Sequence, residues 1–239
     1  MGKALSVQYT SRYPLVRSRA LNATASMAYQ DKDLKDISTY QTTNKKAHVY
    51  PLTLAFDERD GLGRGGLTYG ALSAVSGNVD NAGNSKAFTK FTLDLARIQQ
   101  LGEGWSLYGR WFQQATSDNL DSSEKAMLGG ATGVRAYPSG EAAGDKASLL
   151  QAELRWNSGA WSPYAFYDHG KVRVDARPEL VNLPSPDKTR SGAGLGMRYQ
   201  DGPISWNAAL AWRIQGGLPE ADAKTAGNPR IWVETRYAF

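Results

Sequence analysis

The sequence contains no cysteine and only two histidines, His48 and His169. Without cysteine the chain has no disulfide framework and no cysteine-based metal site, and two distant histidines argue against a catalytic zinc centre. Long apolar runs are also missing, because no stretch approaches the roughly 18 apolar residues that a membrane-spanning helix needs. Basic residues are scattered singly, which argues against nucleic-acid binding despite the net charge of +5.

The first ten residues, MGKALSVQYT, have neither the basic n-region nor the apolar h-region of a signal peptide. Two interpretations remain open at this point. Either the protein stays in the cytoplasm, or these residues belong to the later part of a longer precursor.

Glycine and aromatic residues are abundant, with 25 Gly, 12 Tyr, 7 Trp and 6 Phe. The dominant pattern is alternation with a period of two, which indicates β-strands. In LLQAELRW, for example, Leu150 and Leu154 fall on one face while Gln151 and Glu153 fall on the other. A soluble sandwich would also give this pattern. The estimated strand length of about 10 to 14 residues favours a membrane barrel instead, because strands of globular sheets usually have about 5 to 6 residues.

Connections between the strands alternate between short turns and long loops, which is typical of an up-and-down outer-membrane barrel. Six tryptophans near predicted strand ends would form the aromatic girdles of such a barrel: Trp105, Trp111, Trp156, Trp161, Trp206 and Trp212. The pattern predicts an all-β fold with eleven antiparallel strands, approximately 4–13, 20–34, 45–58, 65–77, 85–99, 104–117, 146–157, 160–174, 188–200, 203–215 and 230–239.

The short stretch EKAMLGG could count as a twelfth strand. Bacterial single-chain barrels usually have an even number of strands, because both chain ends return to the same side. Eleven strands place the two ends on opposite sides. We therefore expect that the first strands of the barrel precede the printed sequence.

The longest predicted interruption of this pattern contains GATGVRAYPSGEAAGD, residues 130–145. It carries a single cation, Arg135, in a setting of glycines. Further along, period two places Phe166, Asp168 and Gly170 on one strand face. A solvated loop arginine and an aspartate in a turn are the alternative interpretations of Arg135 and Asp168.

Four stretches carry a family resemblance: RYPLVRSRALN, NLDSSEKAMLGG, AFYDHGKV and, above all, LGGATGVRAYPSGEAAGD. The last resembles the lid-loop motif of the ShlB/FhaC/HecB transporters, the TpsB partners of two-partner secretion, which are related to BamA-type assembly factors. Ala136 stands where the BamA-type motif VRG(F/Y) has glycine. The resemblance covers essentially the whole chain.

The resemblance implies a sixteen-stranded barrel that follows two periplasmic POTRA domains. Residues 1–239 would then form one partial barrel domain, the carboxy-terminal portion, with residues 129–145 as a lid loop folded into the lumen. It also implies that Arg135 meets Asp168 of an F-x-D-x-G motif. Supporting residues of the two motifs are Gly133, Val134, Tyr137, Pro138, Gly140, Phe166 and Gly170, and Phe239 resembles the carboxy-terminal signal of barrel assembly. We expect Gly170 to leave room for the loop backbone, and Tyr137 and Pro138 to stiffen the loop.

The implied function is a pore without enzymatic activity or cofactor, in the outer membrane of a Gram-negative bacterium. It would secrete and activate an unfolded TpsA-type hemolysin or adhesin. Outer-membrane lipids and the barrel assembly machinery would be further partners. A passive porin-like diffusion channel is the alternative, and an outer-membrane enzyme would need a catalytic constellation that two histidines hardly supply. We expect a generic polar lining of the lumen from Glu153, Arg155, Arg198, Arg213, Glu234 and Arg236.

Overall fold

The computed structural model describes residues 2–37, 42–81, 83–222 and 227–238. Eleven strands form one antiparallel sheet, in which each strand pairs with the next wall strand along the chain. The strands are β1 (Gly2–Arg17), β2 (Leu21–Ile37), β3 (Thr42–Asp60), β4 (Gly66–Asn81), β5 (Asn84–Gly102), β6 (Trp105–Thr116), β9 (Lys146–Trp156), β10 (Trp161–Arg173), β11 (Lys188–Asp201), β12 (Ile204–Gln215) and β13 (Arg230–Tyr237).

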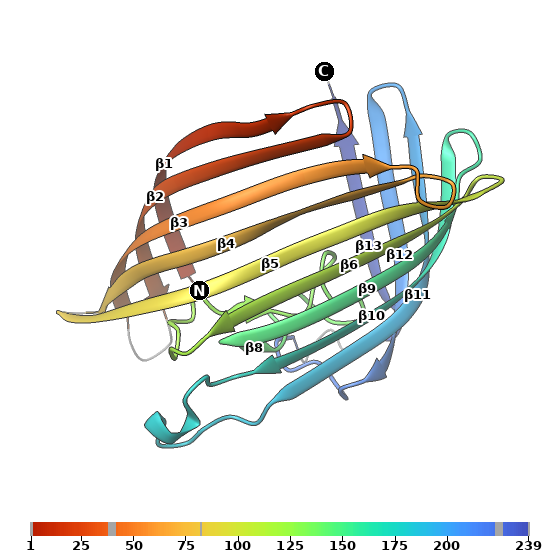
Figure 1. The fold of residues 1–239 in the computed structure, drawn as a ribbon. Coiled ribbons are helices and arrows are strands. Elements are labelled where there is room, and N and C mark those ends of the chain that lie inside the picture. Colours follow the sequence, from red (N-terminus) through yellow and green to blue (C-terminus); the bar gives the residue numbers. More distant parts are fainter. Residues whose placement is uncertain (1, 38–41, 82, 223–226, 239) are drawn as a thin grey trace.

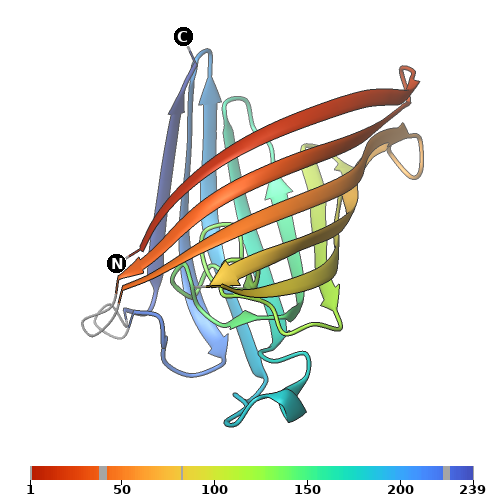
Figure 2. The ribbon, with the colours of Figure 1, turned by 90° about the vertical axis from the view of Figure 1, so that its left-hand side faces the viewer.

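The sheet curves strongly and wraps around the segment that connects β6 to β9 (Figures 1 and 2). The turns at residues 18–20, 61–65, 103–104, 157–160 and 202–203 lie at one end of the sheet, and all long connections lie at the other (Figure 1). The chain begins at the long-loop end and finishes at the tight-turn end (Figure 1). The predicted up-and-down antiparallel architecture is therefore confirmed, including the placement of the two chain ends on opposite sides.

Two predictions about the strands are wrong in detail. The connections expected around residues 31–46 and 76–86 are mostly strand, because β2 to β5 continue their ladders to residues 37, 42, 81 and 84. Polar residues alternate across these extensions, and backbone pairing does not require an apolar face. The strict alternation of short and long connections therefore holds only in the second half of the sheet.

The proposed twelfth strand is also not part of the wall. EKAMLGG contributes only β7 (Ala126–Met127), which pairs with β8 (Ala143–Gly144) in a separate two-stranded ribbon. The ribbon closes the base of the loop that the sheet surrounds. In the described part of the chain no helix is both long and apolar enough to cross a membrane.

The two faces of the sheet differ in the way that period two predicts. On β10 the inner side chains are buried, whereas Tyr167 on the outer face is 45% exposed. The outer face is a broad apolar surface, far larger than the patches that soluble monomers usually expose. Near the tight turns it carries the aromatic pairs Trp105–Trp156 and Trp161–Trp206. This surface fits contact with lipid.

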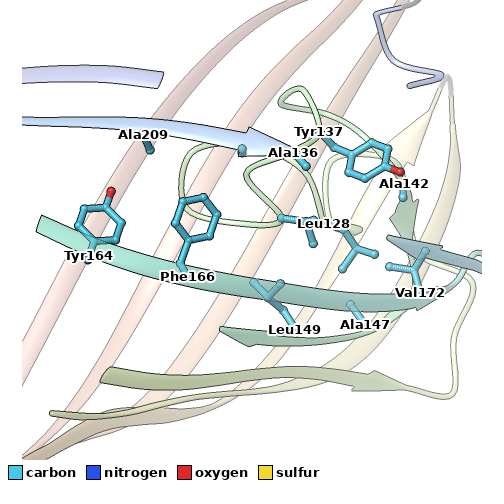
Figure 3. Close-up of a cluster of buried hydrophobic side chains, with 12 residues drawn as sticks. Leu128, Ala136, Tyr137, Ala142, Ala147, Leu149, Tyr164, Phe166, Val172 and Ala209 are labelled. Carbon is cyan, nitrogen blue, oxygen red and sulfur yellow. The ribbon is translucent and has the colours of Figure 1, made fainter. Parts of the chain in front are cut away.

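The main hydrophobic core lies inside the curve, between the enclosed loop and the wall. Leu128, Ala136 and Tyr137 of the loop pack there against inner side chains of β9, β10 and β12 (Figure 3). The loop therefore has the burial of a core segment although it connects two strands.

Candidate functional site

The enclosed connection runs from residue 117 to residue 145, and its second part is the predicted lid loop, residues 129–145. The lid loop holds its own shape through backbone hydrogen bonds. Val134 N donates to Leu128 O over 2.7 Å, Gly130 N donates to Tyr137 O over 3.1 Å, and Tyr137 N donates to Val134 O over 3.0 Å. These bonds form a compact turn with Arg135 at its tip.

Gly133 and Gly140 permit this turn for different reasons. A Cβ atom on Gly133 would lie 2.0 Å from the carbonyl oxygen of Leu128, so no larger residue fits there. Gly140 has open space around it but a φ of +84°, a conformation that other residues rarely adopt. Val134 between them is fully buried.

Asp168 holds the tip of the lid loop. Its Oδ2 accepts hydrogen bonds from Arg135 Nε over 2.9 Å and from the backbone N of Arg135 over 3.0 Å, and its Oδ1 accepts from Nη2 over 2.7 Å. The Asp168 side chain is fully buried and that of Arg135 is 6% exposed. The structure therefore brings together the two residues that the motifs pair, and both alternative interpretations, a solvated arginine and an aspartate in a turn, are wrong.

Glu153 on β9 provides a second carboxylate for the same guanidinium. Its Oε1 lies 2.6 Å from Arg135 Nη1. Its Oε2 forms ion pairs with the Nη2 atoms of Arg155 and Arg198, over 2.7 and 2.8 Å. The ring of Phe166 lies under the Arg135 guanidinium, 3.6 Å from its central carbon to the ring centroid. Arg135 is thus enclosed by two carboxylates and an aromatic face.

The electrostatics of this cluster favour a permanently charged Arg135. Burial alone lowers the pKa of its guanidinium, but the hydrogen bonds and charges of Asp168 and Glu153 outweigh burial and raise that pKa above its ordinary value. Removing one partner from a buried ion pair typically costs about 3–5 kcal/mol, because the other charge remains uncompensated. The cluster is therefore a strong attachment point as long as all its members are present.

The role expected for Gly170 needs a correction. The sequence suggests that it leaves room for the loop backbone, but its neighbour is the side chain of Leu128, whose Cδ2 would lie 2.8 Å from an added Cβ. The lid loop approaches the wall closely at Gly192 on β11, where an added Cβ would lie 2.4 Å from the Cβ of Ala136. Gly192 thereby accommodates the alanine that replaces the glycine of the BamA-type motif.

Tyr137 and Pro138 do more than stiffen the loop. The Tyr137 hydroxyl lies 2.9 Å from Gln215 O and 3.0 Å from Gly217 O, where β12 ends. Pro138 is buried, and its carbonyl oxygen occupies the space next to Gly129, where a Cβ would lie 2.1 Å away. Both residues fix the lid loop against its surroundings.

Several contacts of the lid loop are absent from the sequence-based site. Trp232 on β13 donates from its indole nitrogen to the carbonyl oxygen of Arg135 over 2.7 Å. Fully buried Glu141 accepts from Arg190 Nε and Nη2 over 2.9 and 2.7 Å, and from the backbone nitrogens of Glu220 and Ala221 over 2.9 Å each. A carboxylate one residue after a loop glycine gives no such signal in a sequence.

The residues of the expected polar lining occupy inner-facing positions of their strands, and Arg198, Glu234 and Arg236 border one pocket. Glu153, Arg155 and Arg198 belong to the Arg135 cluster, as described above. Glu234 and Arg236 pair with each other over 2.7 Å in an exposed position, and Arg213 contacts the loop before β13 through Asn228. Phe239 lies outside the described residues, which also contain no cluster of three or more metal-ligating side chains.

A lid loop clasped on the inner side of a curved antiparallel sheet can be compared with known proteins. The family described as "Haemolysin secretion/activation protein ShlB/FhaC/HecB" matches residues 2–199. The chain belongs to this family. Its relatives include the heme/hemopexin transporter protein HuxB of Haemophilus influenzae, which is 25% identical over 230 residues in strain 86-028NP and 23% over 229 residues in strain KW20. Each alignment covers 88% of the chain and 40% of HuxB, so the chain spans well under half of these relatives.

Solved structures confirm the fold of this ShlB/FhaC/HecB chain. CdiB from Escherichia coli superposes with a TM-score of 0.79 over 100% of the chain and 46% of CdiB, at 16% identity. CdiB from Acinetobacter baumannii superposes with a TM-score of 0.73 over 98% of the chain and 41% of that CdiB, at 15% identity. BamA from Haemophilus ducreyi lacking POTRA domains 1–3 superposes with a TM-score of 0.53 over 98% of the chain and 62% of that BamA chain, at 11% identity. The predicted similarity to the BamA fold is therefore confirmed.

Proposed function

We propose that this chain forms the carboxy-terminal wall and the lid of an outer-membrane pore that exports, and thereby activates, one large unfolded polypeptide of the hemolysin or adhesin type. Membership in the ShlB/FhaC/HecB family supports this proposal. So does the apolar outer face, which suits the lipids of a Gram-negative outer membrane. The barrel assembly machinery would insert the pore, and the first strands of a sixteen-stranded barrel would complete it.

The observation that carries the proposal is the buried attachment of Arg135 to Asp168 and Glu153. A lid loop that fills the inside of a pore must be held firmly while the pore is idle and must leave when the polypeptide enters. Ion pairs meet both needs, because they are strong when shielded from water and weak once water reaches them. The sequence contains no nucleotide-binding motif that could supply energy for transport. In this proposal the export is driven by folding of the polypeptide on the outer side.

Deletion of residues 133–144 tests this function in cells that also express the exported partner. A secretion transporter loses export of its partner, because the lid loop is part of the route, while the pore conducts ions more freely. A matched deletion of residues 178–183, in the exposed connection between β10 and β11, leaves export intact. Unchanged export after the first deletion, with only an altered conductance, identifies a passive diffusion channel instead.

A further inference from the structure

The first part of the enclosed connection, residues 117–128, docks on a different part of the wall from the lid loop. We call it the lid stem. Leu120 is 6% exposed and lies in a second hydrophobic cluster, formed with inner side chains of β3, β4 and β5: Ala47, Val49, Val75, Val79 and Phe88. The part of the lid stem before β7 thus inserts an apolar side chain into a hydrophobic socket of the wall.

Acidic residues on both sides of this socket are held by lysines. Asp121 Oδ2 lies 2.7 Å from Lys45 Nζ on β3. Glu124 is 4% exposed, and its two carboxylate oxygens lie 2.8 Å from Lys32 Nζ on β2 and 3.0 Å from Lys90 Nζ on β5. Lys90 Nζ also donates to the backbone oxygen of Glu124 over 2.7 Å.

The wall residues that contact the lid stem combine positive charge with an apolar surface. Three ammonium groups from three strands surround an apolar socket, and all three face the inside of the curve. When the lid stem leaves, these like charges face one another without their carboxylates, which is unfavourable in a partly shielded space. A cavity of about 420 Å³ adjoins Leu120 and Lys45, so the surroundings can accept more chain than the stem itself provides.

We propose that the inner face of β2 to β5 is a binding site for acidic–apolar segments of the exported polypeptide, and that residues 120–124 occupy it in the closed state. The site takes an extended segment with an apolar side chain followed by carboxylates one and four positions later. This inference rests on the proposed export function, since it requires a polypeptide inside the pore. The lid stem then occupies the substrate site in the closed state, and a substrate segment with an apolar side chain and carboxylates at the same spacing displaces it.

A free peptide with the sequence of residues 117–128, SDNLDSSEKAML, tests the site in planar bilayers. The intact protein carries D121N and E124Q, so that its own stem is weakly held. The peptide reduces the current, and a peptide with Asn and Gln in place of Asp121 and Glu124 does so about fivefold more weakly for each replacement. Equal effects of the two peptides, or no effect of either, overturn the proposal.

Variants of the wall provide the matched control. K90Q weakens the block by SDNLDSSEKAML, whereas K46Q leaves it unchanged, because Lys46 lies on the outer face, where its side chain is 72% exposed. Heat-dependent migration in gels first verifies that each variant is folded. Equal weakening by both lysine variants assigns the effect to general charge and contradicts a site on the inner face.

Photo-crosslinking in cells that export the partner separates the two proposals. A crosslinking residue at Val75, in the socket, forms an adduct with the exported polypeptide, and one at Leu72, on the outer face, does not. Peptide block in bilayers without export in cells refutes the function while the site stands. Export without an adduct at Val75 refutes the site alone.

Discussion

Asp168 accepts three hydrogen bonds from one residue, two from the guanidinium of Arg135 and one from its backbone nitrogen. The backbone bond matters because it survives a change of side chain at position 135. A carboxylate at position 168 therefore positions the loop main chain as well as neutralising a charge. Lysine at position 135 would keep the charge but lose the fork geometry that fits this arrangement.

A double-mutant cycle with R135Q and D168N measures this attachment. Each single variant leaves a buried group without its charged partner, so we expect each to open the pore, with a cost to lid closure of about 3–5 kcal/mol. The double variant costs clearly less than the sum of the two. The open probability of single channels in bilayers provides the measurement. Strict additivity would show that the two side chains act independently.

The Arg135–Asp168 pair could be predicted from sequence because both residues stand in short motifs, and because period two fixes the face of the strand on which Asp168 lies. Alternation also predicts that Glu153 faces the inside, but it does not predict the contact with Arg135, because that contact depends on how far the loop extends into the curved sheet. Trp232 could not be predicted at all. Its contact is with a backbone carbonyl, which leaves no trace in the residue type.

Among the larger elements, the connection from residue 117 to residue 145 is fastened at three places. The lid stem pairs with β2, β3 and β5, the tip with β9 and β10, and Glu141 with β11 and the segment after β12. Strand positions were predictable because alternation repeats along each strand. The extent of this docking was not, because a loop has no period from which its buried side can be identified.

E141Q should loosen the segment around residues 216–222. Glu141 accepts hydrogen bonds from the backbone N–H groups of Glu220 and Ala221 and pairs with Arg190. The variant removes the buried carboxylate partner of Arg190 and leaves only the more exposed Glu220 to balance its charge. We expect faster hydrogen exchange at the Glu220 and Ala221 amides. E179Q, at an exposed position of the 3₁₀ turn Pro178–Leu180, serves as the control and should leave that exchange unchanged. Unaltered exchange in E141Q would assign the docking of this segment to Tyr137 and to the ion pairs of Glu220 with Lys188 and Arg190.

At the scale of the whole molecule, the curved sheet has two edges. β1 and β13 each pair with one neighbour among the described strands, so their outer backbone groups are available for pairing. In lipid an unpaired backbone group costs several kcal/mol, which only further strands or another sheet can remove. The twisted, closed cylinder implied by the family resemblance answers this requirement.

Residues 1–239 expressed alone should therefore associate through these edges when they enter lipid. We expect dimers or larger species in native mass spectrometry from nanodiscs. Proline substitutions at outward-facing N–H positions of β13 should reduce the association, because proline removes a donor from the pairing edge. The same substitutions in the exposed turn 61–65 should have no effect. A stable monomer in lipid would show that the sheet closes on itself.

The position of Trp232 makes its fluorescence sensitive to the docking of the lid loop. Trp105, Trp111, Trp156, Trp161 and Trp212 are among the exposed apolar side chains, whereas the indole of Trp232 is bonded to the tip of the lid loop. Departure of the tip would transfer this chromophore from a shielded setting to water and shift its emission to the red. The emission of Trp232 therefore reports whether the tip of the lid loop is docked or displaced.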